Sequence, residues 1–190
     1  MNVELLSYTP EPEELIAQAY GICTGKDTIP VENITRWIER GHVTPIEHAS
    51  ATFHISGISR ACSHQLVRHR LASFSQRSQR YCTEENWEPV RPSSIEENVR
   101  ANHAYYVVME ILSRGYQDLR ALGIPDEDAR FLLPNATPTE LMMTANFREW
   151  RHVIELRGTS HAQWEIRELA FSLQDSLYNI APHVFGASYE

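Results

Sequence analysis

The segment HASATFHI at residues 48–55 alternates polar and apolar side chains throughout its length. Side chains of a β-strand point alternately to its two sides, so the apolar residues of this segment share one face. They are Ala49, Ala51, Phe53 and Ile55. The pattern predicts a half-buried strand that ends at Gly57, after which residues 59–68 form a helix.

Segments with helical periodicity lie on both sides of this strand. Apolar residues recur at helical spacing over residues 10–24 and 31–40, with Gly41 placed to end the second helix. Further along the chain, the sequence SIEE at residues 94–97 predicts a capping box for a long helix that reaches about Leu122.

The C-terminal third combines one more strand with several helices. Residues 126–133 read as a short helix before Pro134, and we favour a strand for residues 139–146. Cap patterns at residues 146–149 and 160–163 predict two further helices. Together these elements indicate an α+β fold, in which a small antiparallel or mixed sheet packs with helices.

The composition limits the class of protein. With 190 residues, of which 42% are hydrophobic, the chain fits a single domain over residues 1–190. It has no apolar run of about 20 residues, so we expect a soluble, cytoplasmic protein that does not enter a membrane. Its three cysteines form no CxxC pattern, and its net charge of −8 argues against nucleic acid as a partner.

The segment RHRLASFSQRSQRY at residues 68–81 is the strongest chemical signal in the sequence. It contains four arginines, a histidine and three serines, and 16 of the 17 basic residues of the chain are arginine. Guanidinium groups bind phosphate through paired hydrogen bonds, and serine hydroxyls add further donors. The segment therefore predicts a site for a small anion.

Metal binding is the less favoured alternative. His42, His48 and His54 recur every six residues, but strand residues six apart lie about 20 Å from one another and cannot share an ion. Cys62, His64 and Cys82 do not complete a set of zinc ligands, so we predict no metal site.

Nucleophilic catalysis is a second alternative. Ser78 or Cys82 could act as the nucleophile, because neighbouring arginines would lower the pKa of a thiol. The sequence shows no histidine–carboxylate arrangement that would activate either residue, and this question stays open at the level of sequence.

The pattern RHR, seven residues, then serine, at residues 68–70 and 78, resembles the signature of the flavin-dependent thymidylate synthases. Two further segments are similar to the family and fall in the expected order. They are HVTPIEH at residues 42–48 and LRGTSHAQWEI at residues 156–166. The resemblance covers about residues 30–185 and implies an α+β fold specific to the family, with homotetramers whose active sites lie at subunit junctions.

The resemblance also implies an activity. The family are FAD-dependent methyltransferases that convert dUMP to dTMP, with methylenetetrahydrofolate as carbon donor, NADPH as reductant and FAD as hydride carrier. In that setting the protein supplies orientation and electrostatics, and the flavin supplies the difficult chemistry.

Site residues follow from the resemblance position by position. It assigns Arg157, Ser78 and His42 to catalysis, with Arg157 at the uracil carbonyl edge and His42 over the flavin ring. It assigns FAD binding to Thr44, Glu47, Arg68, His69, Arg70, Gln76, Asn146, Arg148, His152, Leu156 and His161. It assigns dUMP binding to Gln65, Arg68, Gln76, Ser78, Gln79, Arg80, Arg130 and Arg157.

The sequence leaves three points open. Gln76 stands where many members of the family have glutamate, and His64 where some have arginine. For Ser78 we favour a positioning role over covalent addition, because no base can be assigned to it. The competing function is a non-catalytic nucleotide-binding regulator that keeps the arginine-rich pocket.

Overall fold

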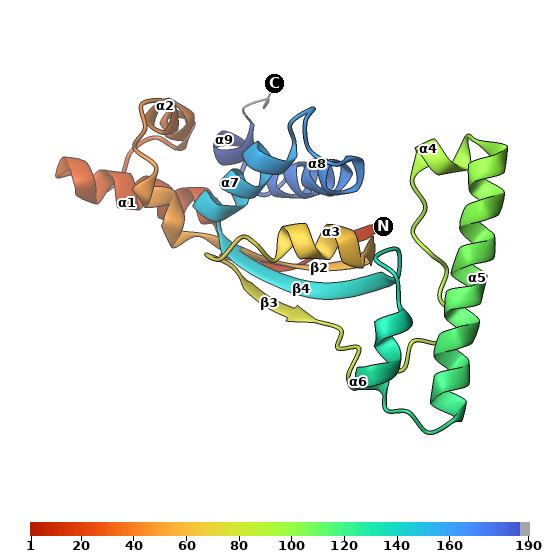
Figure 1. Cartoon of the computed structure of the whole chain (residues 1–190). Coiled ribbons are helices and arrows are strands. Elements are labelled where there is room, and N and C mark those ends of the chain that lie inside the picture. The colour runs from red at the N-terminus through yellow and green to blue at the C-terminus, as the bar shows by residue number, and fades with distance from the viewer. Residues whose placement is uncertain (187–190) are drawn as a thin grey trace. The chain divides into compact units, whose positions relative to one another are not determined.

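A computed structural model describes residues 1–186 and shows an α+β fold, as the sequence predicts (Figure 1). Four strands form an antiparallel sheet in the order β1-β2-β4-β3. Their bounds are Asn2–Tyr8 (β1), Ser50–Ser59 (β2), Ser73–Gln76 (β3) and Pro138–Asn146 (β4). The strands predicted over residues 48–55 and 139–146 are thereby confirmed.

Strand β2 carries the predicted apolar face but is longer than predicted. Ala51, Phe53 and Ile55 are at most 1% exposed. The strand does not end at Gly57, because glycine adopts a φ of +69° there and lets the chain bend without leaving the sheet. Helix α3, Arg60–Leu66, begins only after Ser59, so the arginine segment follows the helix rather than ending it.

The described chain divides into two compact units. The first contains residues 1–55, 66–75 and 142–186, and the second contains residues 56–65 and 76–141. Strands β2 and β4 run from one unit into the other.

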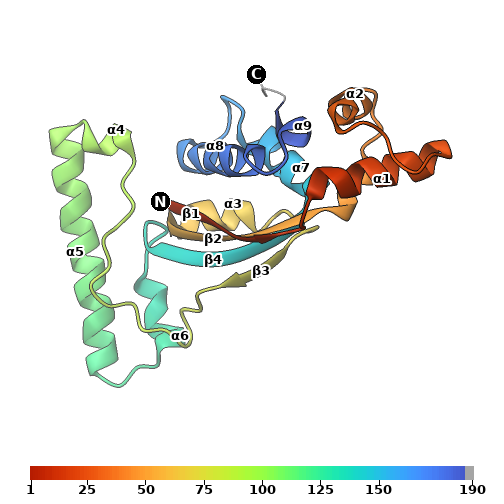
Figure 2. The ribbon, with the colours of Figure 1, turned by 180° about the vertical axis from the view of Figure 1, so that it is seen from behind.

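The first unit holds most of the helices. They are α1 (Pro12–Thr24), α2 (Ile34–Glu39), α7 (Phe147–Arg157), α8 (Trp164–Tyr178), α9 (Pro182–Phe185) and the short 3-10 turns Val31–Asn33 and Thr44–His48. Helices α7 and α8 lie on the same face of the sheet in both views (Figures 1 and 2).

Helix α7 is fixed to β2 at its first turn. The amide of Phe147 donates to the carbonyl of Ala49 at 2.8 Å, and the indole of the buried Trp150 donates to the carbonyl of Ala51 at 3.1 Å. The same indole packs edge-on against Phe53, with ring centroids 5.1 Å apart. Residues in this helix therefore have a defined position relative to the sheet.

The cap of α7 is as predicted. The side chain of Asn146 accepts a hydrogen bond from the amide of Glu149 at 2.9 Å. The helix predicted after residues 160–163 is present, but α8 begins at Trp164, later than a cap at Ser160 predicts. Its capping side chain is Gln163, which accepts from the amides of Glu165 and Ile166.

The second unit contains α4 (Ser93–Glu96), α5 (Val99–Ala121), α6 (Asp126–Ala129) and the 3-10 turn Arg130–Leu132. The capping box predicted at residues 94–97 is wrong. Asn98 caps α5 instead: its extended backbone aims the side chain at the amides of Arg100 and Ala101, each at 3.1 Å.

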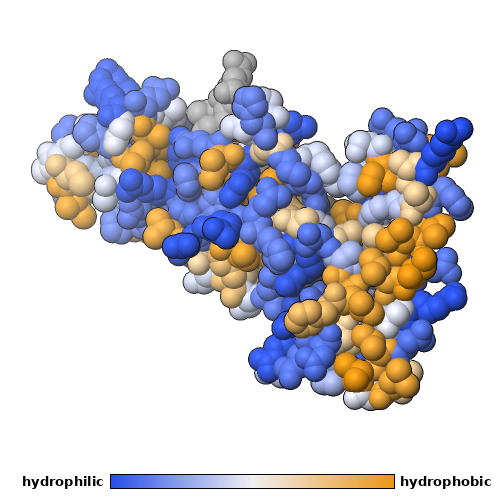
Figure 3. All heavy atoms as spheres, viewed as in Figure 1, coloured by the Kyte–Doolittle hydropathy of each residue, from blue (hydrophilic) through white to orange (hydrophobic). Residues whose placement is uncertain are grey.

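Tyr116 anchors α5 within this unit. It is 1% exposed, its hydroxyl donates to Asp126 at 3.0 Å, and it accepts from the amide of Glu84 at 3.1 Å. Much of the remaining helix is apolar and exposed, as the orange spheres over α5 show (Figure 3). The exposed apolar residues include Val99, Tyr106, Val107, Val108 and Ile111. Among the described helices, none is long and apolar enough to span a lipid bilayer.

Candidate active site

His69, from the arginine-rich segment, is hydrogen-bonded on both ring nitrogens in the first unit. Its Nδ1 lies 3.2 Å from Oε1 of Glu149, and its Nε2 accepts from Nε of Arg157 at 3.1 Å. Only 4% of His69 and 5% of Glu149 is exposed. Two residues that the family resemblance assigns to the site, His69 and Arg157, are thereby in direct contact.

These contacts define the protonation state of the imidazole. Arginine is only a donor, so Nε2 of His69 must present its lone pair to Arg157. The proton of the neutral ring then sits on Nδ1 and is donated to the carboxylate of Glu149. Burial, the charge of Arg157 and the nearby His152 lower the pKa of His69 to about 4. Burial raises the pKa of Glu149.

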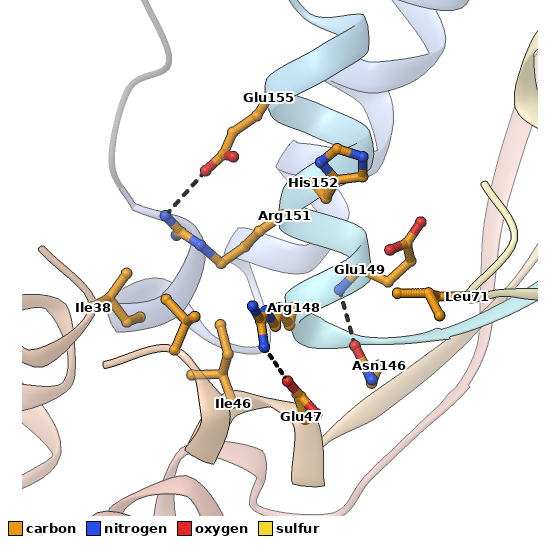
Figure 4. Close-up of a pocket in the computed structure, with 11 residues that line it drawn as sticks. Ile38, Ile46, Glu47, Leu71, Asn146, Arg148, Glu149, Arg151, His152 and Glu155 are labelled. Atoms are coloured by element: carbon orange, nitrogen blue, oxygen red, sulfur yellow. Dashed lines mark hydrogen bonds and ion pairs between the residues drawn. The ribbon is translucent and has the colours of Figure 1, made fainter. Parts of the chain in front are cut away.

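A pocket of about 710 Å³ opens beside this group, between the 3-10 turn Thr44–His48 and the start of α7 (Figure 4). It is lined by Ile38, Val43, Ile46, Glu47, Leu71, Asn146, Arg148, Glu149, Arg151, His152 and Glu155. Four of these residues were assigned to FAD by the resemblance: Glu47, Asn146, Arg148 and His152. The pocket has the size and the mixture of apolar and polar groups typical of a cofactor site.

Two ion pairs lie at the lining of the pocket, one across it and one along α7. Arg148 is paired with Glu47, and Arg151 lies 3.5 Å from Glu155 on the next turn of α7 (Figure 4). Arg151 also donates to the carbonyl of Val184. The ring of His152 meets that of His69 edge-on at 5.5 Å, which connects the pocket lining to the buried histidine.

Other residues predicted for FAD lie at the surface of the first unit, outside the described lining of this pocket. They are Thr44, Arg68, Arg70, Leu156 and His161, together with His42, which the resemblance assigns to catalysis over the flavin ring. The ring of His42 packs edge-on against Trp37 at 5.2 Å. Their assignment to FAD stays a prediction.

The residues predicted to bind dUMP, apart from Arg68 and Arg157, belong to the second unit. Ser78 forms a tight turn there, in which its carbonyl accepts from the amides of Tyr81 and Cys82 at 3.2 and 2.9 Å. Its hydroxyl oxygen accepts from the amide of Arg80 at 3.3 Å. Among the described residues, no histidine or carboxylate is hydrogen-bonded to that hydroxyl, which favours positioning over nucleophilic attack.

Glu127 links two of the predicted phosphate ligands. Its carboxylate accepts from Nε of Arg80 at 2.9 Å, and its backbone carbonyl accepts from Nε of Arg130 at 3.0 Å. The hydrogen bond to Glu127 raises the pKa of Arg80. Both guanidinium groups are therefore hydrogen-bonded to Glu127.

The three predicted glutamines differ in their surroundings. The amide of Gln76 donates to the hydroxyls of Ser63 and Thr139 at 2.9 and 3.3 Å. Gln65 reaches the carbonyl of Ala61 at 3.5 Å. The amide nitrogen of Gln79 is buried and has no hydrogen-bond partner among the described residues, so it is a donor that a ligand could satisfy.

Glu149 is the site residue that the sequence does not reveal. Its place as the third residue of a helix is readable from the cap, but such glutamates are ordinarily solvated. Its burial depends on a contact with His69, 80 positions away in the chain. Within residues 1–186, no three His, Cys, Asp or Glu side chains cluster as metal ligands would.

The α+β fold carries an arginine-bearing pocket in one unit and an arginine–serine turn in the other, and both are features suited to anionic ligands. Residues 4–183 match the family model described as thymidylate synthase complementing protein. The chain is 39% identical to the flavin-dependent thymidylate synthase of Geobacter sulfurreducens, over 97% of this chain and 85% of that protein.

Two further relatives carry the same name. The flavin-dependent thymidylate synthase of Nitratidesulfovibrio vulgaris is 38% identical, over 97% of this chain and 85% of that protein. The flavin-dependent thymidylate synthase of Pyrococcus furiosus is 38% identical, over 93% of this chain and 79% of that protein. This chain belongs to the flavin-dependent thymidylate synthase family. The competing interpretation, a non-catalytic nucleotide-binding regulator, has no support from these comparisons.

Proposed function

We propose that this chain is an FAD-dependent methyltransferase that converts dUMP to dTMP by reductive methylation, with methylenetetrahydrofolate as carbon donor and NADPH as reductant. The family match over residues 4–183 supports the activity. The structural observation that carries the proposal is the pocket beside His69, because four residues assigned to FAD from separate segments line one cavity.

The residues present in the pocket fit FAD. Arg148, Arg151 and His152 offer donors for a pyrophosphate, and Ile38 and Ile46 offer an apolar wall for an aromatic ring system. When bound, FAD supplies the hydride that completes the new methyl group. We propose that Thr44, Arg68, Arg70, Gln76, Leu156 and His161 add further contacts to it, and that His42 lies over its flavin ring as a catalytic residue.

Arg157 is the proposed catalytic residue at the uracil. Its Nε is committed to His69, so contact with a uracil carbonyl would fall to its two terminal nitrogens. A guanidinium at that carbonyl stabilises negative charge as uracil C5 becomes nucleophilic, without any change in its own protonation.

The Ser78 turn, with Arg80 and Arg130, is the proposed binding site for the dUMP phosphate and sugar. The hydroxyl of Ser78 already accepts from the Arg80 amide, so its proton is available as a donor to the nucleotide. A dianionic phosphate would displace the Glu127 carboxylate from Arg80, because the ion pair is exposed and therefore weak. Gln65 and Gln79 complete the proposed set.

The two units act as one functional domain in this proposal, since the family match spans both. We also propose a homotetramer with active sites at subunit junctions, as the family resemblance implies. A cytoplasmic location is consistent with nucleotide synthesis.

The decisive experiment is a visible absorption titration of the purified protein with FAD, followed by a dTMP assay with dUMP, methylenetetrahydrofolate and NADPH. We expect bound flavin and dTMP. Arg157→Ala should retain flavin and lower kcat by about 100- to 1,000-fold, the typical effect of losing one donor to a developing charge. Arg114→Ala, an exposed arginine on α5, is the control. A protein without flavin uptake, or an active Arg157→Ala variant, would contradict the proposal.

A further inference from the structure

We propose that Glu149 is a positioning residue that orients Arg157 through the imidazole of His69. This inference rests on the proposed function, in which Arg157 contacts uracil, and it adds to the site a residue that lies outside the signature motif.

A neutral imidazole has two tautomers, with the proton on Nδ1 or on Nε2. If the proton sat on Nε2, two N–H donors would face each other between His69 and Arg157, and their hydrogen bond would be lost. A carboxylate at Nδ1 is an acceptor only, so Glu149 selects the tautomer with the proton on Nδ1. The lone pair of Nε2 is then always presented to Arg157.

The carboxylate can do this because it is itself held in place. The amide of Glu149 is capped by Asn146, and the side chain is 5% exposed. His69 is equally enclosed, with a side-chain exposure of 2%. Water cannot reach either group to replace this hydrogen bond. Breaking it would leave a buried polar atom without a partner, which is unfavourable, so the pair stays formed.

Glu149 and Arg157 lie near opposite ends of the same helix, α7. His69, from a segment far away in sequence, bonds to both of them. The guanidinium is thus tied by its Nε to a fixed ring, which removes rotational freedom from a long side chain at the last residue of a helix.

The charged groups around His69 support a neutral ring. Arg157 and His152 both oppose a positive charge on it, and Glu149 is the one carboxylate in the described contacts of the ring. The imidazole therefore works as a hydrogen-bond relay that transmits orientation, without taking up a proton.

The test uses NMR of the protein without cofactor, which separates it from the activity assay. Two-bond ¹H–¹⁵N correlations at pH 7.5 report which nitrogen of His69 carries the proton. In the wild-type protein we expect protonated Nδ1 and unprotonated Nε2. A ring with protonated Nε2, or a charged ring, would overturn the proposal.

Two variants of the carboxylate separate orientation from stability. Glu149→Gln keeps an acceptor oxygen, so the tautomer should be retained and kcat should stay within about fivefold of wild type. Glu149→Leu removes the acceptor, so both tautomers should appear, and kcat should fall by about 10- to 100-fold, as for other partners that orient a functional histidine. The KM for dUMP should change much less than kcat.

Glu13 provides a matched control. It is 7% exposed and lies 2.8 Å from Nδ1 of His183, so it is also a buried carboxylate beside a histidine, but outside the proposed site. Glu13→Leu should lower the thermal stability without changing the tautomer of His69 or kcat.

The outcomes separate the two proposals. Equal kcat values for Glu149→Leu and wild type would overturn the positioning role even if dTMP is made. If Glu149→Leu fails to fold, Glu149→Met, which follows the shape of glutamate without an acceptor oxygen, is measured in its place, and a kcat equal to that of the wild type would overturn the positioning role. Absence of dTMP from the wild-type protein would instead contradict the proposed function, whatever the tautomer.

Discussion

Arg157 donates a hydrogen bond from its Nε to Nε2 of His69 at 3.1 Å, although 88 positions separate the two residues in sequence. This contact requires a neutral imidazole, because a protonated ring would have a hydrogen on Nε2. The lowered pKa of His69 has the same origin, since the guanidinium charge and the burial both oppose protonation.

Stability should therefore depend on pH through His69. Its pKa is about 4 in the folded protein against an ordinary 6.5, so the unfolded chain takes up the proton first as the pH falls. The stabilisation of the folded protein that comes from keeping His69 neutral is complete above pH 6.5. It is lost progressively between pH 6.5 and about 4. Integrated over that window, it amounts to about 3 kcal/mol of the free energy of unfolding.

Urea unfolding of the wild-type protein and His69→Gln at several pH values measures this effect. Glutamine can accept from Arg157 and donate to Glu149 but does not titrate. Glu149, whose pKa is raised by burial, is present in both proteins and largely cancels in the comparison. The stability advantage of the wild type should shrink as the pH falls to 4. An advantage that is constant with pH would show that His69 is not held neutral by the fold.

Asn146 should contribute to stability through its side-chain oxygen, which caps α7, and to FAD binding through its side-chain amide. Asn146→Ala removes the cap of α7 and should lower the free energy of unfolding by about 1 kcal/mol. Asn146→Asp keeps a capping oxygen, so it should restore stability while removing the amide donor that we assign to FAD. Chemical denaturation and FAD titration give the two readouts.

The control for that pair is Asn98→Ala, which removes the equivalent cap from α5 in the second unit. It should cost a similar free energy and leave the affinity for FAD unchanged. If Asn146→Asp binds FAD as the wild type does, the amide of Asn146 is only structural.

Ser78 should be important but not essential for dTMP formation. The Ser78→Ala variant loses one hydrogen bond to the nucleotide, so we expect activity to fall by about tenfold, with dTMP still produced. Ser78→Cys should behave similarly. Complete loss in the Ala variant, together with a covalent nucleotide adduct of the wild type by mass spectrometry, would instead identify a nucleophile.

Glu127 should compete with the nucleotide for Arg80. Its carboxylate occupies Nε of that arginine at 2.9 Å. The Glu127→Gln variant removes the charge and keeps the backbone carbonyl that holds Arg130, so the KM for dUMP should fall by about two- to fivefold. Steady-state kinetics at low ionic strength measure this. An unchanged KM would show that phosphate does not use Arg80.

Much of the fold follows from local patterns in the sequence. The apolar face of residues 49–55 and the cap at Asn146 are decided by neighbours along the chain, and both are predicted correctly. Strands β1 and β3 are not predicted. The first carries exposed apolar residues such as Leu6 and Tyr8, and the second lies in the arginine–serine segment, so neither shows one buried face. Their strand conformation comes from pairing with the sheet.

The site is predictable where residue types form a motif and not where burial gives a residue its role. His69 and Arg157 are found by resemblance, and their contact could not be read from spacing. The start of α5 shows a related limit: two acceptable caps lie four residues apart, and only the backbone conformation at Asn98 selects the second. For Glu149 the cap indicates a place in the first turn of a helix, but its burial has no local signal, because its partner His69 is distant in sequence.

Strand β4 passes directly into α7 at Asn146, without an intervening loop. One residue inserted at this junction would rotate the whole helix by about 100° relative to the sheet. Arg148, Glu149, His152 and Arg157 would turn together, away from the pocket and from His69. The spacing between residues 138 and 157 should therefore tolerate no change in length, so that differences in length among relatives have to fall elsewhere in the chain.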